Sequence, residues 1–283
     1  MRRSALFFTV TMLLLTGAAS ERAEANPSRI VSLNFCSDQL LMQLVPAERI
    51  ASVTHLSRAP LGGLSASVKG IALNYGTAEE LLRLDPDLAV AGTGSTPALR
   101  AILRQRGIPL IEVPNAESFA AIRANIRLLA HAAGEEAKAE ALIAHMNDTL
   151  VHAPKIPATL RPRVVGWDGA GSVQAAGTLF DAVLTAAGGV NAAAEAHMFI
   201  IYGRYRAFDP ERLLALRPDF IAYGSGRDLA NDLASAELQH PAMRRFFAHR
   251  FIAYPDTPVI CGLPQTADIA AQLARAFMRK AAP

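Results

Sequence analysis

The chain has 283 residues, with 28 basic and 25 acidic side chains and a formal net charge of +3. The basic residues form no block and no stripe interleaved with aromatic residues, so nucleic acid is excluded as a serious candidate partner. Apart from the N-terminal segment, no stretch is both apolar enough and long enough to span a bilayer as a helix.

The N-terminal segment has the pattern of a secretory signal peptide. Arg2 and Arg3 precede an apolar stretch from Ala5 to Leu15, and a small-residue sequence of the A-x-A type ends at Ala25. The apolar stretch is too short for a spanning helix, and no cysteine lies near Ala25 to carry a lipid anchor. We therefore expect cleavage after Ala25 and a soluble mature chain in a bacterial periplasm.

Short apolar runs alternate with helical patterns along the mature chain, as in α/β proteins. In the first half they predict strands and helices at residues 29–33, 39–44, 49–54, 98–106, 109–113 and 118–133. In the second half they predict further elements at residues 163–167, 179–187, 251–254 and 267–279.

A long helix is predicted between the two halves. Gly134 interrupts the preceding helical pattern, which resumes over residues 135–151 for about 25 Å at 1.5 Å per residue. A proline-rich joint follows. We therefore predict an N-terminal lobe over residues 26–134, a linking helix over 135–153 and a C-terminal lobe over 154–283.

One sequence unit occurs once in each half. Residues 77–92 (TAEELLRLDPDLAVAG) and 209–224 (DPERLLALRPDFIAYG) match at seven of sixteen positions without a gap. Each unit reads as a helix with an early glutamate, a Pro-Asp corner that ends the helix, and a buried strand closed by glycine. The repeat predicts two similar α/β lobes with small, mostly parallel sheets and a ligand cleft between them.

The two cysteines, Cys36 and Cys261, lie near opposite ends of the mature chain in predicted loops. In an oxidising compartment such a pair favours a disulfide, and two free thiols or a ligand role are the alternatives. Their spacing matches no closed zinc motif.

Known catalytic signatures are missing from the sequence, which contains no GxSxG, HExxH or Walker motif. Asp38, Asp168 and His55 are the acid/base candidates if the protein is an exported enzyme, which is the less favoured alternative. A receptor for bare zinc or manganese is the other alternative. For it only His55 and His197 are available in predicted loops, without carboxylates at a supporting spacing.

The signal peptide, the strand RIVSL, the two E-x-L-L-x-L-x-P-D units and the long central helix together resemble one family. It is the family of periplasmic binding proteins that deliver vitamin B12, ferric siderophores and haem to ABC importers. The resemblance implies two α/β lobes joined by one long rigid helix, no enzymatic activity and a monomer. It implies no cofactor apart from the Fe or Co of the ligand itself.

In this family a glutamate on each lobe docks to the membrane subunits of the importer, and the matching residues here are Glu79 and Glu211. The family's ligand lies between the lobes, on loops at the strand ends. In this chain those loops are residues 34–38, 55–63, 74–76, 167–172, 199–208, 224–227 and 258–264.

Aromatic faces and guanidinium groups in these loops are the candidate ligand contacts, because they stack on planar groups and bind anionic ones. They are Phe35, Arg58, Tyr75, Trp167, Tyr202, Arg204, Tyr205, Arg206 and Arg227. The arginines favour a ferric siderophore first, with cobalamin next and haem third. For haem, which takes an axial ligand, the candidates are Tyr75, Tyr202, Tyr205, His55 and His197.

Overall fold

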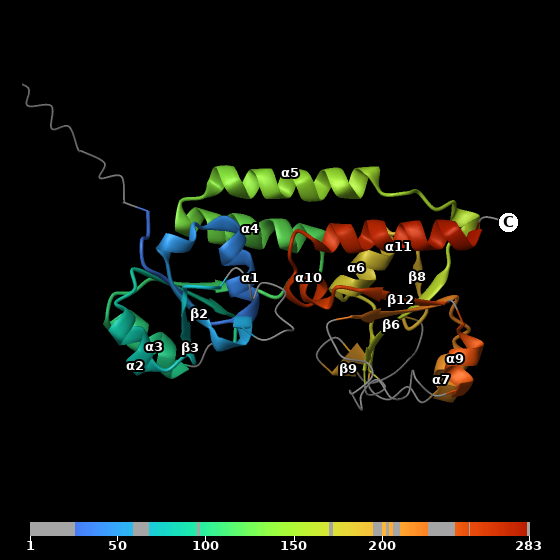
Figure 1. The fold of residues 1–283 in the computed structure, drawn as a ribbon, viewed down its shortest axis with the longest axis horizontal. Helices are drawn as coiled ribbons and strands as arrows, with labels where there is room; N and C mark the ends of the chain where they lie inside the picture. Colours follow the sequence, from blue (N-terminus) through green and yellow to red (C-terminus); the bar gives the residue numbers. More distant parts are fainter. Residues whose placement is uncertain are drawn as a thin grey trace, which may run out of the picture.

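The structure, a computed structural model, describes residues 26–58, 68–94, 97–169, 172–194, 200–201, 204–205, 210–225, 241–248 and 250–281. These residues form two α/β lobes that share a layer of long helices (Figure 1). The predicted signal peptide, residues 1–25, lies outside the described part of the chain.

The sheet of the first lobe is parallel, with the strand order β3-β2-β1-β4-β5. Its strands are β1 (Ile30–Ser32), β2 (Ile50–Thr54), β3 (Ala72–Asn74), β4 (Leu88–Gly92) and β5 (Leu110–Val113). Its helices are α1 (Phe35–Leu44), α2 (Ala78–Leu84), α3 (Pro97–Gln105) and α4 (Phe119–Ala133). Strands β1 and β4 consist almost wholly of buried residues, as expected where helices cover a parallel sheet.

The sheet of the second lobe combines parallel and antiparallel strands in the order β12-β11-β6-β7-β10-β9, with β8 beside β6. Parallel pairs join β6, β8, β11 and β12, and antiparallel pairs add β7, β10 and β9. The strands are β6 (Arg163–Gly169), β7 (Ser172–Gln174), β8 (Val190–Asn191), β9 (Ile200–Ile201), β10 (Arg204–Tyr205), β11 (Phe220–Gly224) and β12 (Phe251–Tyr254). The helices are α6 (Leu179–Ala186), α7 (Pro210–Ala215), α9 (Pro241–Phe246), α10 (Asp256–Cys261) and α11 (Thr266–Ala281).

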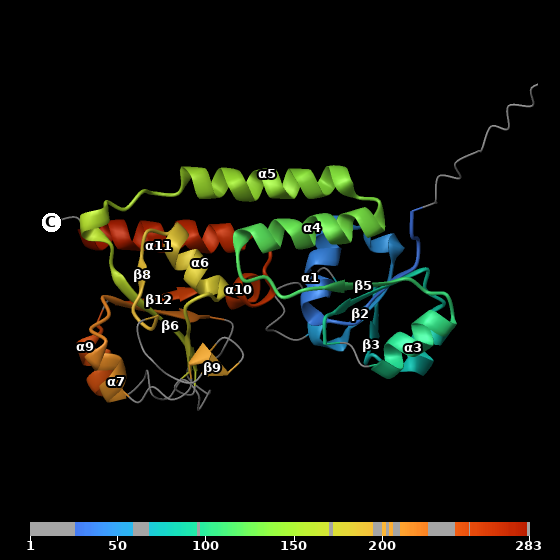
Figure 2. The ribbon, with the colours of Figure 1, turned by 180° about the vertical axis from the view of Figure 1, so that it is seen from behind.

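Helix α5 (Glu136–His152) lies along one side of both lobes. Figures 1 and 2 show α4 of the first lobe and α11 of the second lobe end to end beneath it. One hydrophobic cluster joins Ile126 and Leu129 of α4 to Leu263 and Ala267 of the second lobe. The predicted α/β fold of two lobes is therefore confirmed, and the helical layer packs the lobes together.

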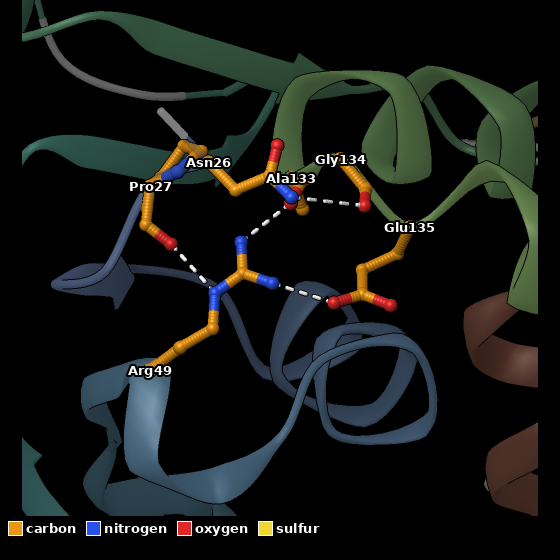
Figure 3. Close-up of polar contacts among 6 residues, drawn as sticks. All are labelled: Asn26, Pro27, Arg49, Ala133, Gly134 and Glu135. Atoms are coloured by element: carbon orange, nitrogen blue, oxygen red, sulfur yellow. Dashed lines mark hydrogen bonds and ion pairs between the residues drawn. The ribbon is translucent and has the colours of Figure 1, made fainter. Parts of the chain in front are cut away.

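The corner between α4 and α5 is held by Arg49, at the end of the short helix η1 (Ala47–Arg49). Its guanidinium donates to the carbonyl oxygens of Ala133 and Pro27 at 2.5 and 2.7 Å (Figure 3). It also pairs with the Glu135 carboxylate at 2.5 Å. Because a cation offsets the negative end of a helix dipole, Arg49 stabilises the end of α4 while fixing the start of α5.

The repeated sequence unit has the same backbone geometry in both lobes. Asp85 and Arg217, which are equivalent in the repeat, are the two non-glycine residues with positive φ among the described residues, at 45° and 47°. This left-handed conformation is uncommon for residues other than glycine. Its presence at equivalent positions indicates that each corner needs the same sharp turn after helices α2 and α7.

The aspartate of each Pro-Asp corner binds the first strand of its own lobe. The Asp87 carboxylate accepts the backbone N–H groups of Ser28 and Arg29 at 2.7 and 2.9 Å. In the second lobe the Asp219 carboxylate accepts the backbone N–H of Arg163 at 2.9 Å. Each corner therefore satisfies backbone donors at the start of β1 or β6 and joins a surface helix to the sheet.

The glycine that ends each unit makes room for the start of a helix. A Cβ atom on Gly92 would lie 3.1 Å from Asn34 Nδ2, and one on Gly224 would lie 2.4 Å from the Cβ of Asp256. Asn34 is the N-cap of α1, and Asp256 is the first residue of α10. The repeated glycines thus allow α1 and α10 to begin against the strand ends.

Helices α1 and α10 belong to different lobes and are joined by a disulfide. Cys36 lies in the first turn of α1 and Cys261 is the last residue of α10, and their sulfur atoms are bonded at 2.03 Å. Beside them, Gln265 Nε2 donates to Gln43 Oε1 at 2.8 Å. The lobes are therefore connected covalently at two places, through α5 on one side and through the disulfide at the strand ends.

Several predicted loops contain regular structure. Residues 35–38 form the first turn of α1, because the Asn34 side chain caps that helix by accepting the N–H groups of Cys36 and Ser37. Residues 258–261 complete α10, which Gly262 stops with φ 63°. Within residues 199–208, the two-residue strands β9 and β10 extend the second sheet.

Replacing Asp87 by Asn is expected to lower the free energy of unfolding at pH 7 by about 1 kcal/mol, since it weakens charge-assisted hydrogen bonds. Partial burial acts to raise the pKa of Asp87, but hydrogen bonds from the Ser28 and Arg29 backbone hold that pKa below its usual value. A lowered folded-state pKa gives stability that is present above the unfolded-state pKa and lost on acidification.

The stability difference between the wild type and Asp87→Asn should therefore shrink below about pH 4, as urea unfolding across pH would measure. Asp85→Asn removes the same charge two residues away, where no side-chain hydrogen bond to the strand is present, and is the control. Equal effects of the two substitutions would contradict the role assigned to Asp87.

Replacing Cys36 and Cys261 together by Ser should lower the free energy of unfolding by about 2–4 kcal/mol, because the crosslink restricts the unfolded chain. Urea unfolding with and without a reductant measures the effect. The reduced wild type should match the double variant, and the reductant should leave the double variant unchanged. A wild-type midpoint that is insensitive to the reductant would contradict the expectation.

Candidate functional site

The candidate site lies at the edge of the first sheet where its parallel strands end. The carboxyl ends of parallel strands share one edge, which is a favoured ligand position in open α/β sheets. Here β1 leads into the cap of α1, β2 into the short helix η2 (His55–Arg58), and β3 into Tyr75. The disulfide places this edge beside the second lobe.

His55 and Tyr75 form a stacked pair at this edge. Their ring centroids are 4.4 Å apart with an interplanar angle of 21°. Tyr75 is 69% exposed, and His55 is also exposed. An exposed aromatic face of this kind is costly in solution and suits a planar ligand. Tyr75 was a predicted ligand contact, and its pairing with His55 was not predicted.

The backbone of Tyr75 is held by a capping box. Glu80 Oε2 accepts the backbone N–H groups of Tyr75 and Thr77 at 2.9 and 3.2 Å, and Thr77 caps α2. The hydrogen bond from the Tyr75 N–H is the largest cause that lowers the pKa of Glu80. The pattern T-x-x-E before a helix is the sequence signal that identifies this box.

Asp38, in the first turn of α1, is fully buried and contacts the turn that carries His55. Its Oδ2 accepts the backbone N–H of Thr54 at 3.1 Å, the Thr54 hydroxyl at 2.5 Å and the Ser57 hydroxyl at 2.7 Å. Burial raises the pKa of Asp38, and hydrogen bonds with Ser32, Thr54 and Ser57 act in the opposite direction. The sequence offered Asp38 as an acid/base candidate, whereas the structure gives it contacts with the start and middle of η2.

Two further predicted contacts lie at the same edge. Arg58 is exposed at the end of η2, and Phe35 is half-buried in the first turn of α1. The structure thus brings Phe35, Arg58 and Tyr75 to one side of the first lobe.

A small cavity of about 30 Å³ separates the lobes next to the disulfide. The first lobe contributes Ser37, whose buried hydroxyl has no hydrogen-bond partner among the described residues. The second lobe contributes Ile260, which is 53% exposed, and Gly262. The two lobes are therefore in contact around this cavity.

Fewer of the predicted ligand contacts in the second lobe have described side chains. Trp167 in β6 is 3% exposed and belongs to a hydrophobic cluster with Val165, Val173 and Ile221. Its ring therefore packs in the core of the lobe. Arg204 and Tyr205 are described only in their backbone, as β10, and Tyr202, Arg206, Arg227 and His197 lie outside the described residues. The ligand role of all these residues stays a prediction.

Glu79 and Glu211 lie in the first turns of α2 and α7 and are exposed. Figure 1 shows these helices on different lobes, both on the side away from α5. The separation suits a partner that contacts both lobes at once, and the docking role stays a prediction.

Metal-binding clusters and membrane-spanning helices are both absent from the described part of the chain. The described residues contain no group of three or more His, Cys, Asp or Glu side chains placed to hold a metal ion. None of the helices they form combines the length and the apolar character that crossing a membrane requires.

Two α/β lobes joined by one long helix, with candidate contacts at the strand ends, define a solute-binding protein of the rigid-helix type. Residues 30–245 match the family described as periplasmic binding protein. The chain belongs to this family, and it is a binding protein and not an enzyme.

A cobalamin-binding protein of Halobacterium salinarum is 27% identical over 217 residues. The match covers 75% of this chain and 58% of that protein, so the chain spans little more than half of this relative's length. The apo structure of the haem-binding protein RhuT from Roseiflexus sp. RS-1 has a TM-score of 0.68 and 26% identity, over 90% of this chain and 99% of RhuT.

The vitamin B12-binding protein BtuF of Vibrio cholerae has a TM-score of 0.64 over 91% of this chain and 99% of BtuF. Its sequence identity is 17%, so this likeness concerns the fold alone.

Proposed function

We propose that the protein is a periplasmic receptor that delivers a metal chelate to an ABC importer in the inner membrane. The observation that carries the proposal is the exposed His55–Tyr75 pair at the carboxyl edge of the first sheet. A chelate arrives with its metal already coordinated, so the receptor needs apolar area and a few polar anchors. The stacked pair supplies the area, and Arg58 supplies a cationic anchor for a carboxylate or phosphate.

Among the chelates expected from the sequence, the described residues favour a tetrapyrrole, either haem or cobalamin. A stacked aromatic pair matches a flat macrocycle, and Tyr75 also has the phenol that serves as an axial ligand of haem iron in some proteins. The names of the Halobacterium salinarum relative and of RhuT support the same class. A ferric siderophore was expected first because of arginines that, apart from Arg58, have no described side chain.

Ligand binding is tested by titrating the mature protein with haemin, cobalamin and a panel of ferric siderophores. Trp167 is the single tryptophan and reports binding by quenching, after correction for absorption by the coloured ligands. One tetrapyrrole should bind at micromolar affinity or tighter. Binding of siderophores alone would overturn the tetrapyrrole assignment and leave the receptor class standing.

Replacing Tyr75 by Ala should weaken tetrapyrrole binding about tenfold, since one aromatic contact contributes about 1 kcal/mol beyond its area. Phe246→Ala is the matched control, because Phe246 is 52% exposed on α9 of the second lobe. If haem is the ligand, Tyr75→Phe should also change the visible spectrum of the complex. Equal affinities of Tyr75→Ala and Phe246→Ala would contradict the role of the stacked pair.

For docking, reversing both charges with Glu79→Lys and Glu211→Lys should leave ligand affinity nearly unchanged and reduce uptake by the importer severalfold. Uptake into membrane vesicles that contain the importer measures this effect. Glu48→Lys with Asp268→Lys is the control, because it reverses one exposed acidic residue on each lobe elsewhere. Unaltered uptake by the first pair would refute the docking assignment.

A further inference from the structure

Asp38 makes its hydrogen bonds to the turn that presents His55. Thr54 is the last residue of β2, and Ser57 lies inside η2. One carboxylate oxygen, Oδ2, binds both residues, with distances of 2.5 Å to the Thr54 hydroxyl and 2.7 Å to the Ser57 hydroxyl. The two residues between these anchors, His55 and Leu56, are exposed. The turn is therefore fixed from below while its outer face remains open.

Gln39, the next residue of α1, also forms a hydrogen bond with Ser57. Its Nε2 donates to the Ser57 hydroxyl at 3.4 Å, and its side chain is buried. The first turn of α1 thus holds η2 through two consecutive side chains. On the other side of the stack, Glu80 holds the backbone of Tyr75 at 2.9 Å. A carboxylate thus binds the backbone of Tyr75, and another binds the two residues that flank His55 and Leu56.

A buried carboxylate is an expensive way to stabilise a turn. Its desolvation is the largest influence on its pKa and opposes the charged form, whereas hydrogen bonds with the side chains of Ser32, Thr54 and Ser57 favour that form. An apolar side chain of similar size at this position would avoid that cost. A buried polar residue that costs stability and lies near a binding site typically serves binding and not stability.

We propose that Asp38 is a positioning residue, which holds η2 so that the His55 ring stacks on Tyr75 and forms the ligand-binding face. The inference rests on the proposed function, because the face matters only if the ligand binds there. Asp38 itself is fully buried and does not contact the ligand.

The test compares Asp38→Leu, which fills the volume without an acceptor, with Asp38→Asn, which keeps one acceptor oxygen. The first measurement is the NMR chemical shift of the His55 ring protons in ligand-free protein, which the ring current of Tyr75 displaces. In Asp38→Leu these signals should move to their positions in Tyr75→Ala, and haemin or cobalamin affinity should fall about tenfold. Asp38→Asn should restore most of both.

Asn191→Leu is the matched control. Asn191 is 5% exposed in β8 of the second lobe and donates to the Gln174 carbonyl oxygen at 3.2 Å. It should leave the His55 signals and the affinity unchanged. If the role of Asp38 is only structural, the ligand affinity of both Asp38 variants should change in parallel with their midpoints of urea unfolding. Positioning predicts a loss of affinity in Asp38→Leu even where its midpoint equals or exceeds that of the wild type.

Unmoved His55 signals in Asp38→Leu, or an equal affinity loss in Asn191→Leu, would overturn the inference. If Asp38→Leu does not fold, Thr54→Val and Ser57→Ala each remove one donor to Asp38, and unmoved His55 signals in both overturn it equally. If the signals move but the wild type binds neither haemin nor cobalamin, the positioning role holds and the proposed ligand class fails.

Discussion

Parallel strands place their carboxyl ends at one edge of a sheet, and the candidate site depends on this constraint. The short strands β1, β2 and β3 place Asn34, His55 and Tyr75, which come from three separate segments of the sequence, at one edge of the sheet. None of these residues belongs to a local motif that binds a ligand. The sheet supplies the proximity, and the hydrogen bonds of Asp38 and Glu80 convert proximity into a defined orientation.

The repeated unit made the fold predictable from one sequence. Its Pro-Asp corner and terminal glycine report local backbone requirements, namely a left-handed residue, a carboxylate for the strand start and space for a neighbouring helix. Such requirements appear directly in residue identity. The linking helix is visible for the same reason, since Gly134 at φ 69° separates α4 from α5.

The site was less predictable, because its residues are defined by their neighbours in space. Trp167 is followed by a glycine-rich turn. In the sequence, a tryptophan at such a position looks the same whether it is exposed in a loop or buried in a strand. His55 gave no sign that its ring meets Tyr75, twenty residues further along the chain. Helix α10 was not predicted, because proline and glycine residues are typical of turns. In the structure Pro258 lies in the first turn of α10, and Gly262 follows its last residue.

The two connections between the lobes form a closed covalent ring that runs from Cys36 through α5 to Cys261. A hinge needs one flexible joint, and bodies fastened at two separated points retain only twisting and local deformation. The disulfide and α5 therefore restrict how far the two lobes can move relative to each other. Under the proposed function, a chelate that binds between the lobes would have to match a spacing that these two connections limit.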